Sequence, residues 1–288
     1  MTRKKLKRDI YQEVTDTIIA ALEAGTAPWQ KSWAACGTAF PTRVTGEQYR
    51  GINVMILAMQ GRSAPTWMTY KQAAELGGNV RKGEKAATIT FFKPLKVEKD
   101  GVEETIPLLR AYNVFNVEQI DGLPEKFYPV AAEPRHTGDR DREVDLYIRD
   151  TRADIRHGGG RAFYVPSEDY IQLPNFDQFE DAEAYYGTAL HELAHWTGAE
   201  KRLDRNIKNA NGTKDYAREE LVAEMSAAFL TAKLGVENSP RDDHAQYLSH
   251  WLGVMKEDKK AIFKAATAAQ KVVDYLDAQQ THQQEQAA

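Results

Sequence analysis

The stretch GTALHELAHWTGAEKRLDR, residues Gly187 to Arg205, contains two histidines four positions apart, with a glutamate directly after the first. Helix periodicity places His191 and His195 on one face, so both imidazoles can bind the same ion from consecutive turns. Glu192 lies about 100° further round the helix, within reach of a water molecule on that ion. A polar helix can show this spacing by chance, so the metal interpretation needs a third ligand from elsewhere in the chain.

The segment REELVAEMSAAF, which follows on a second predicted helix, supplies the missing carboxylates. A catalytic zinc site uses three protein ligands and leaves one tetrahedral position for water. Glu220 and Glu224 are again at positions i and i+4, so one can bind the ion while the other accepts a hydrogen bond from a ligand histidine. The pattern E-x-x-A-E resembles the ExxxD element of the glutamate-ligand zincins, which implies Glu220 as the ligand and Glu224 as the histidine's partner. Glu219 is the alternative ligand.

These residues predict one zinc ion per chain, with another divalent transition metal as the alternative, and a metallopeptidase chemistry in which Glu192 is the catalytic residue. A metal-dependent nuclease is a poorer interpretation, because such sites favour clusters of carboxylates around Mg²⁺. The sequence does not single out a donor for the oxyanion of a peptidase reaction. The candidates, each of which also suits a surface or packing role, are Tyr216, His244, Tyr247 and His250.

Composition describes a globular protein with room for two cores. The 288-residue chain is 42% apolar and has no apolar run near the roughly 18 residues of a membrane helix. The basic N-terminus continues into an amphipathic pattern, which predicts no signal peptide. One cysteine, Cys36, cannot form an internal disulfide, which fits a cytoplasmic location.

Charge divides the chain into two halves. Lys and Arg outnumber Asp and Glu by 18 to 14 over residues 1–128, whereas the balance is 20 to 28 over residues 129–288. Such a division indicates two domains with different partners, of which the first is better suited to a polyanion.

Periodicity and turn signals predict an α+β protein of two domains. The domains are expected at residues 1–130 and 143–278, with a linker over 131–142 and a disordered tail over 279–288. The first should be α+β, and the second mostly helical with a small sheet. Helices are expected over 10–25, 52–59, 69–77, 143–152, 179–198, 217–235 and, as one or two helices, 244–279. Strands are expected over 86–92, 111–120, 161–165 and 169–174.

The basic half places aromatic residues beside cations. Single-stranded DNA is bound by aromatic faces that stack bases beside a groove of Lys and Arg, so this pattern predicts a single-strand-binding surface. The alternative is that the tryptophans belong to the core and the cations to a solvated face. The candidate DNA-binding residues are Trp29, Lys31, Trp33, Tyr49, Arg50, Trp67, Tyr70, Lys71, Arg81, Lys82 and Lys85.

Several segments of the sequence resemble those of one protein family. APWQKSW, YRGINVMIL, PTWMTYKQAAELGGNVRKGEK and YNVFNVEQIDGLP are similar to the N-terminal domain of ArdC-type antirestriction proteins of conjugative plasmids, a domain also found at the front of TraC-type plasmid primases. AFYVPSEDYIQLP, HELAHWTG and REELVAEMSAAFL are similar to their C-terminal metallopeptidase-like domain.

The resemblance implies an N-terminal module that binds single-stranded DNA and a C-terminal domain related to zincins of the SprT and Spartan kind. It also implies protection of incoming plasmid DNA from restriction by the recipient cell. Spartan-type sites use a third histidine, but no histidine lies between His195 and His244, so Glu220 is the better third ligand here. Nothing beyond the shared N-terminal domain suggests a primase.

Two functions of different classes follow. In the first, strand binding concentrates a zinc peptidase on transferred DNA, where it acts on a protein substrate such as a host restriction enzyme. In the second, the protein is a DNA-binding shield whose metal site is structural or idle. No membrane partner is expected in either case.

Overall fold

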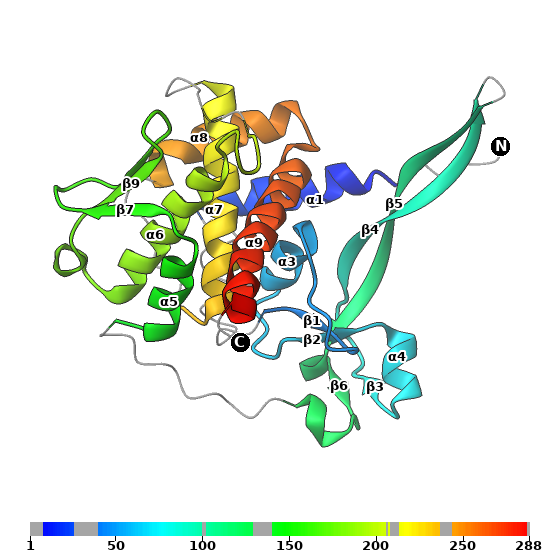
Figure 1. Ribbon diagram of the computed structural model, residues 1–288. Coiled ribbons are helices and arrows are strands. Elements are labelled where there is room, and N and C mark those ends of the chain that lie inside the picture. The colour runs from blue at the N-terminus through cyan, green and yellow to red at the C-terminus, as the bar shows by residue number, and fades with distance from the viewer. Residues whose placement is uncertain are drawn as a thin grey trace.

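The computed structural model describes residues 8–25, 40–99, 102–128, 140–205, 207, 213–236 and 244–286. Its α+β architecture has an N-terminal region that contains the larger sheet and a C-terminal region of long helices with a small sheet (Figure 1). The predicted fold class is confirmed. Trp29, Lys31, Trp33 and Cys36 lie outside the described residues, as does most of the predicted linker.

The N-terminal region contains a four-stranded sheet in the order β1-β2-β5-β4. The strand β1 is parallel to β2, and the remaining pairs are antiparallel. The elements of this region are α1 (Ile10–Glu23), β1 (Thr42–Arg43), α3 (Ile52–Ala58), β2 (Thr66–Met68), α4 (Tyr70–Glu75), β3 (Asn79–Val80), β4 (Ala87–Lys99), β5 (Val102–Asn116) and β6 (Ile120–Asp121).

The hairpin of β4 and β5 is much longer than the sequence predicted. Pairing runs from Ala87 opposite Val114 to Lys99 opposite Val102, and the hairpin projects from the rest of the molecule (Figure 1). Its outer half lacks a clean apolar alternation, which is why the pattern did not reveal it. At the other end β5 stops at Asn116, because the Asn116 side chain caps a 3-10 helix over Val117–Gln119.

A small second core lies beneath α4. The predicted capping box is present, because the Thr69 hydroxyl accepts from the backbone of Gln72 and the Gln72 side chain accepts from the backbone of Thr69. The strands β3 and β6 form a separate two-stranded sheet beside this helix. The buried apolar residues of this second core are Ala64, Met68, Ala73, Val117, Ile120 and Leu123.

The C-terminal region is built around α7, which packs against α6, α8 and α9. Its three-stranded sheet has the order β7-β9-β8. The strand β7 was not predicted, because its sequence DIRH has no alternation and its place in the sheet depends on parallel pairing with β9. The elements are α5 (Arg142–Asp150), β7 (Asp154–His157), β8 (Phe163–Val165), β9 (Tyr170–Leu173), α6 (Ala182–Thr197), α7 (Lys214–Leu234), α8 (His244–Glu257) and α9 (Ala261–Gln286).

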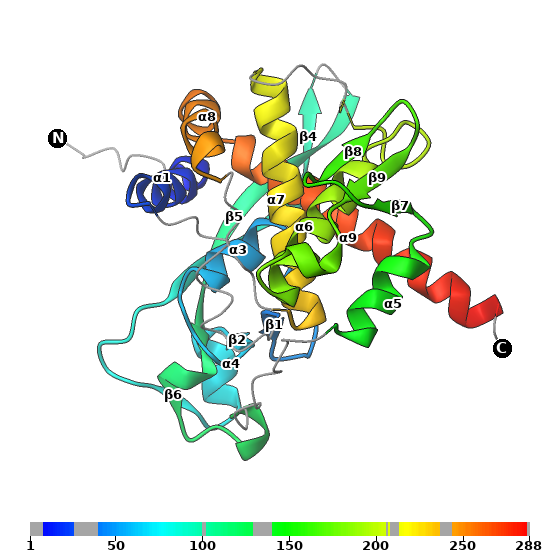
Figure 2. The same cartoon turned by 90° about the vertical axis from the view of Figure 1, so that its left-hand side faces the viewer.

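The two regions share one main hydrophobic core. The helix α1 packs against α8, and α3 packs against α9 (Figure 2). Ile18 of α1 and Leu57 of α3 are 1% exposed and belong to the same buried cluster as Phe229 and Val272. The main core therefore crosses from one region to the other, and the second cluster of buried apolar residues among those described is the small one under α4.

The last helix reaches Gln286, so it covers most of the segment that the sequence predicted to be a disordered tail. Gln280 supports the extension, because its side-chain amide donates to the carbonyl of Tyr147 in α5. A polar glutamine at the end of an apolar pattern gave no sign of this tertiary contact. None of the helices that the structure describes is long and apolar enough to cross a membrane.

Candidate metal centre

The helix α6 carries the HExxH sequence through the centre of the C-terminal region. It begins at Asp181, whose carboxylate accepts from the backbone N–H of Ala184 at 2.7 Å, an ordinary N-cap. His191 and Glu192 are 2% and 4% exposed, so the motif lies in the protein interior. The two histidine rings meet edge to face with centroids 4.8 Å apart.

The loop after α6 folds back against the end of the helix. Gly198 allows the loop to approach the helix closely, because a Cβ at this position would lie 2.5 Å from the Ile207 side chain and 3.1 Å from Arg205 Nη2. Arg205 then reaches between the helices, where Nη2 donates to the Ala194 carbonyl at 2.6 Å and to Glu219 at 2.8 Å. The guanidinium therefore ties the end of α6 to the start of α7.

Three candidate ligand residues form a small triangle. His195 Nε2 lies 3.1 Å from His191 Nε2, Glu220 Oε2 lies 3.6 Å from His191 Nε2, and Glu220 Oε1 lies 3.4 Å from His195 Nε2. Zinc bonds of about 2.0 to 2.1 Å in a tetrahedron place ligand atoms roughly 3.3 Å apart. The size of the triangle and the donors in it, two imidazoles and one carboxylate, fit a divalent ion.

Each histidine also has a carboxylate at its other nitrogen. Glu224 Oε1 lies 3.1 Å from His191 Nδ1, which agrees with the partner role expected for Glu224. Glu219 Oε1 lies 3.2 Å from His195 Nδ1 and is itself held by Arg205. Glu219, the alternative ligand at the sequence level, is thus the corresponding partner of the second histidine. Such partners fix the tautomer and the orientation of a ligand imidazole.

The cluster concentrates negative charge in the interior. Four buried carboxylates, those of Glu192, Glu219, Glu220 and Glu224, surround two imidazoles and one guanidinium. Burial opposes the charged form of His195, but hydrogen bonds to Glu219 and Glu220 outweigh it and raise the pKa of His195 well above its ordinary range. Burial likewise opposes ionisation of Glu220, yet His191 and His195 lower its pKa. The arrangement therefore favours a cation between the two histidines.

Among the four oxyanion candidates, Tyr216 has a hydroxyl that interacts with the candidate ligand Glu220. Its hydroxyl lies 3.2 Å from that of Tyr247. Burial, together with Tyr247 and Glu220, raises the pKa of Tyr216. The phenol therefore stays protonated and can donate a hydrogen bond to a carbonyl oxygen. His250 has an exposed side chain on α8, and the side chain of His244 lies outside the described part of the chain.

The predicted DNA-binding aromatics divide into two groups. Tyr49 and Trp67 are only 4% and 3% exposed and belong to the main core, so neither has a face on which a base can stack. This contradicts their predicted stacking role and agrees with the alternative that such rings are core residues. Tyr70 is 58% exposed and keeps its ring available.

The predicted cations also differ in their surroundings. Lys71, Lys82 and Lys85 are exposed. Arg50 forms an ion pair with Asp274 of α9 and so links the two regions.

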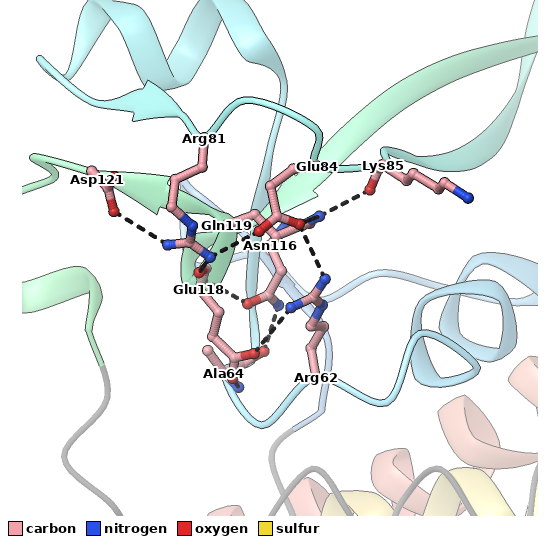
Figure 3. A network of polar contacts seen from close by, with 9 residues as sticks. All are labelled: Arg62, Ala64, Arg81, Glu84, Lys85, Asn116, Glu118, Gln119 and Asp121. Atoms are coloured by element: carbon pink, nitrogen blue, oxygen red, sulfur yellow. Dashed lines mark hydrogen bonds and ion pairs between the residues drawn. The ribbon is translucent and has the colours of Figure 1, made fainter.

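Arg81 is bound in a polar network (Figure 3). It donates to Glu84 at 2.9 Å and to Asp121 at 3.2 Å, which makes its first role a structural one.

Comparisons with known proteins cover both regions. A family model described as a zincin-like metallopeptidase matches residues 142–268, and one described as the N-terminal domain of anti-restriction factor ArdC matches residues 8–115. Two Escherichia coli proteins named DNA primase TraC are 40% and 39% identical over 94% of this chain. The chain spans only 27% and 20% of the length of those relatives.

Other relatives match over nearly their whole length. An uncharacterized protein of Sinorhizobium fredii, y4eC, is 38% identical over 96% of this chain and 94% of its own. The metal-free crystal structure of the antirestriction protein ArdC from plasmid R388 has a TM-score of 0.84 at 44% identity and covers 96% of this chain and 99% of that one. Its Mn(II)-bound structure has a TM-score of 0.81, with 94% and 98% covered. The chain belongs to the ArdC family of antirestriction proteins, with a zincin-like C-terminal region.

Proposed function

We propose that this protein binds single-stranded DNA, protects incoming plasmid DNA from restriction during conjugation, and acts there as a zinc-dependent peptidase. The observation that carries the enzymatic part is the triangle of His191, His195 and Glu220, in which each pair of side chains approaches to between 3.1 and 3.6 Å. The family of the chain supports the antirestriction role.

Zinc is the ion that this donor set favours. Two imidazoles and one carboxylate match catalytic zinc sites, whereas Mg²⁺ and Ca²⁺ take mainly oxygen ligands. An Mn(II)-bound crystal structure of the related ArdC from plasmid R388 supports the binding of a divalent ion. When bound, zinc would polarise a peptide carbonyl and acidify a water molecule.

The side chains of the protein supply the remaining steps. Glu192 accepts a proton from the attacking water and returns it to the leaving amine. Tyr216, with its raised pKa, donates a hydrogen bond to the carbonyl oxygen as charge develops on it. The edge strand β8, which packs against α6, is the strand to which an extended peptide would add.

The DNA-binding part rests on exposed cations and rings. Tyr70, Lys71, Lys82 and Lys85 are accessible around α4 and the turn that follows β3. Strand binding through such residues would neutralise phosphates and release counterions, so it should weaken steeply with salt. Affinity for oligo-dT that scarcely changes between low and moderate salt would contradict this part.

A second function keeps the DNA binding and drops the catalysis. The metal site lies within the main core that both regions share, so a bound ion there would stabilise the whole fold whether or not it reacts. In this alternative the protein is a shield, and substrate turnover plays no part in antirestriction.

Glu192→Gln separates the two functions. The variant should keep its metal, because Glu192 is not one of the three candidate ligands, and should lose peptidase activity by about 10² to 10⁴-fold. Metal content is measured by elemental analysis, cleavage with unfolded casein, and antirestriction by plasmid transfer into a restricting recipient. Glu200→Gln, an exposed glutamate just after α6, is the matched control.

Antirestriction that survives in Glu192→Gln would support the shield, and casein cleavage at the unmodified rate would contradict the role of Glu192. Point variants are preferable to isolated halves in these assays. Truncation near residue 130 would remove α8 and α9, against which α1 and α3 pack, and would expose the shared core.

A further inference from the structure

A cleft of 360 Å³ opens between α1, β4, the loop after α6 and the start of α9. It is separate from the triangle of metal ligands, since none of the three candidate ligands lines it. It also contains none of the DNA-binding residues that the sequence predicted. Its described lining residues are Tyr11, Phe92, Leu203, Arg205, Lys260, Phe263, Lys264, Thr267, Ala268 and Lys271.

The charge of the cleft is positive throughout. Four of its lining residues are cations, and no described lining residue is acidic. Lys264 and Lys271 stand two helical turns apart on α9, a separation of about 10 Å, and Lys260 comes just before the helix. Such a row suits an extended polyanion better than a single small ion.

The four cations differ in the hydrogen bonds and ion pairs that they form within the protein. Arg205 is held by Glu219, Thr197 and the Ala194 carbonyl, so it forms part of the wall. Lys264 pairs with Asp258 at 2.8 Å, but its side chain is 71% exposed. Lys271 forms no ion pair with any residue that the structure describes. The lysines are therefore the groups available to an incoming ligand.

Aromatic rings line the same cleft. Phe92 of β4 is 48% exposed. Exposure of so much of a large apolar ring to water is unfavourable, so it calls for an explanation. Tyr11 and Phe263 meet edge to face with centroids 4.8 Å apart, and Lys260 Nζ lies 5.1 Å from the centre of the Tyr11 ring. Phe92 thus offers a free face beside a row of ammonium groups.

We propose that this cleft is a binding site for single-stranded DNA, with a base stacked on Phe92 and phosphates at Lys260, Lys264 and Lys271. The proposal rests on the proposed function and adds to it a site whose four described cations all come from the acidic C-terminal half. An accessible ring beside lysines is the combination that single strands use. A duplex keeps its bases stacked inside, and an acidic peptide needs no ring.

The experiment measures binding of fluorescent oligo-dT of about 20 nucleotides to the full-length protein by anisotropy, over a range of salt concentrations. Lys260→Gln, Lys264→Gln and Lys271→Gln are combined in one cleft variant. It should bind on the order of tenfold or more weakly at moderate salt, and its salt slope should fall by about 2, since each phosphate contact on a single strand contributes about 0.7. Phe92→Leu should bind oligo-dT about tenfold more weakly than the unmodified protein. Phe92→Tyr keeps an aromatic ring, so it should bind with the unmodified affinity.

The matched control changes the same charge elsewhere, at the exposed lysines Lys126, Lys214 and Lys256, which are not among the proposed DNA-binding residues. It should bind more tightly than the cleft variant. Equal loss of affinity in the two triple variants would overturn the site, because the total charge of the protein would then determine binding. Displacement of oligo-dT by poly-glutamate at equal charge concentration would also overturn it. Unchanged binding in the cleft variant, with matching circular dichroism spectra, would overturn the site alone. Failure of the unmodified protein to bind would overturn the proposed DNA-binding function as well.

Discussion

Two polar clusters in this protein contain similar residues but have different roles. The first lies between α6 and α7 and comprises His191, His195, Glu219, Glu220 and Glu224. The second, drawn in Figure 3, lies in the N-terminal region around Arg62, Arg81, Glu84, Glu118 and Gln119. Both join glutamates to cationic or amide side chains from separate elements. They differ in the balance of carboxylates and cationic side chains.

The N-terminal cluster is satisfied from within. Glu84 accepts from Arg81 and from the Gln119 amide at 2.9 Å each, and Arg62 Nη2 lies 3.5 Å away. Glu118 accepts from the backbone of Ala64 at 2.7 Å. A network with a donor for each carboxylate fixes loops against one another and needs no ligand.

The cluster between α6 and α7 contains more carboxylates than cationic side chains. Arg205 forms an ion pair with Glu219, and the Glu220 carboxylate lies beside both imidazoles, which lower its pKa. Excess buried negative charge is costly, so an added cation would complete this site. The contrast separates a structural network from a binding site by the balance of charge.

The largest expected effect comes from removing a ligand. Glu220→Gln should lower bound zinc from about one ion per chain to nearly none, because an amide is a poor zinc ligand and two imidazoles alone do not complete the site. Elemental analysis after dialysis against zinc buffer measures this. Glu118→Gln, the corresponding change in the N-terminal cluster, should leave the zinc content unchanged. Full zinc occupancy in Glu220→Gln would show that the triangle is not the metal site.

A smaller effect is expected from the carboxylates behind the histidines. Glu219→Gln and Glu224→Gln should each weaken zinc binding by about 10 to 100-fold, because the ligand imidazole loses the partner that orients it and increases its basicity. Competition with a chromophoric chelator gives the affinities. If neither change weakens binding, Glu219 and Glu224 only fill space beside the rings.

The sequence predicted the parts of the site that lie close together along the chain. The positions of His191, Glu192 and His195 follow from helix periodicity, and so does the i, i+4 relation of Glu220 and Glu224. The pairing of Glu219 with His195 did not follow, because it depends on how α6 crosses α7 and on Arg205 from the intervening loop. No local pattern encodes such a contact.

The same limit explains the errors in the N-terminal half. Tyr49 and Trp67 stand beside cations in the sequence, but burial in a core shared with the C-terminal helices decides their role. The unpredicted strand β7 and the outer half of the β4–β5 hairpin also depend on partners distant in the sequence or on pairing without alternation. Helices with clear apolar periodicity, such as α1, α6 and α7, were predicted well because their signal is local.

The smallest effect concerns stability, and it tests whether the N-terminal cluster is complete without a ligand. Hydrogen bonds from Gln119 and Arg81 lower the pKa of Glu84 below its ordinary value of 4.5. A depressed pKa means that the ionised group stabilises the fold above pH 4.5 and that this contribution is lost as the pH falls through the folded-state pKa. Glu84→Gln should therefore lower the melting temperature at pH 7 by roughly 2 to 4 °C, with unchanged zinc content.

The pH dependence makes this prediction specific to the ionised carboxylate. In acid Glu84 of the unmodified protein becomes neutral, so its melting temperature should approach that of Glu84→Gln as the pH falls below 4.5. Thermal unfolding followed by circular dichroism across this range measures the convergence. A gap that stays constant with pH would mean that Glu84 contributes through shape alone. A gap that depends on added zinc would mean that this cluster, like the one between α6 and α7, is completed by a metal, and the contrast between the two clusters would then fail.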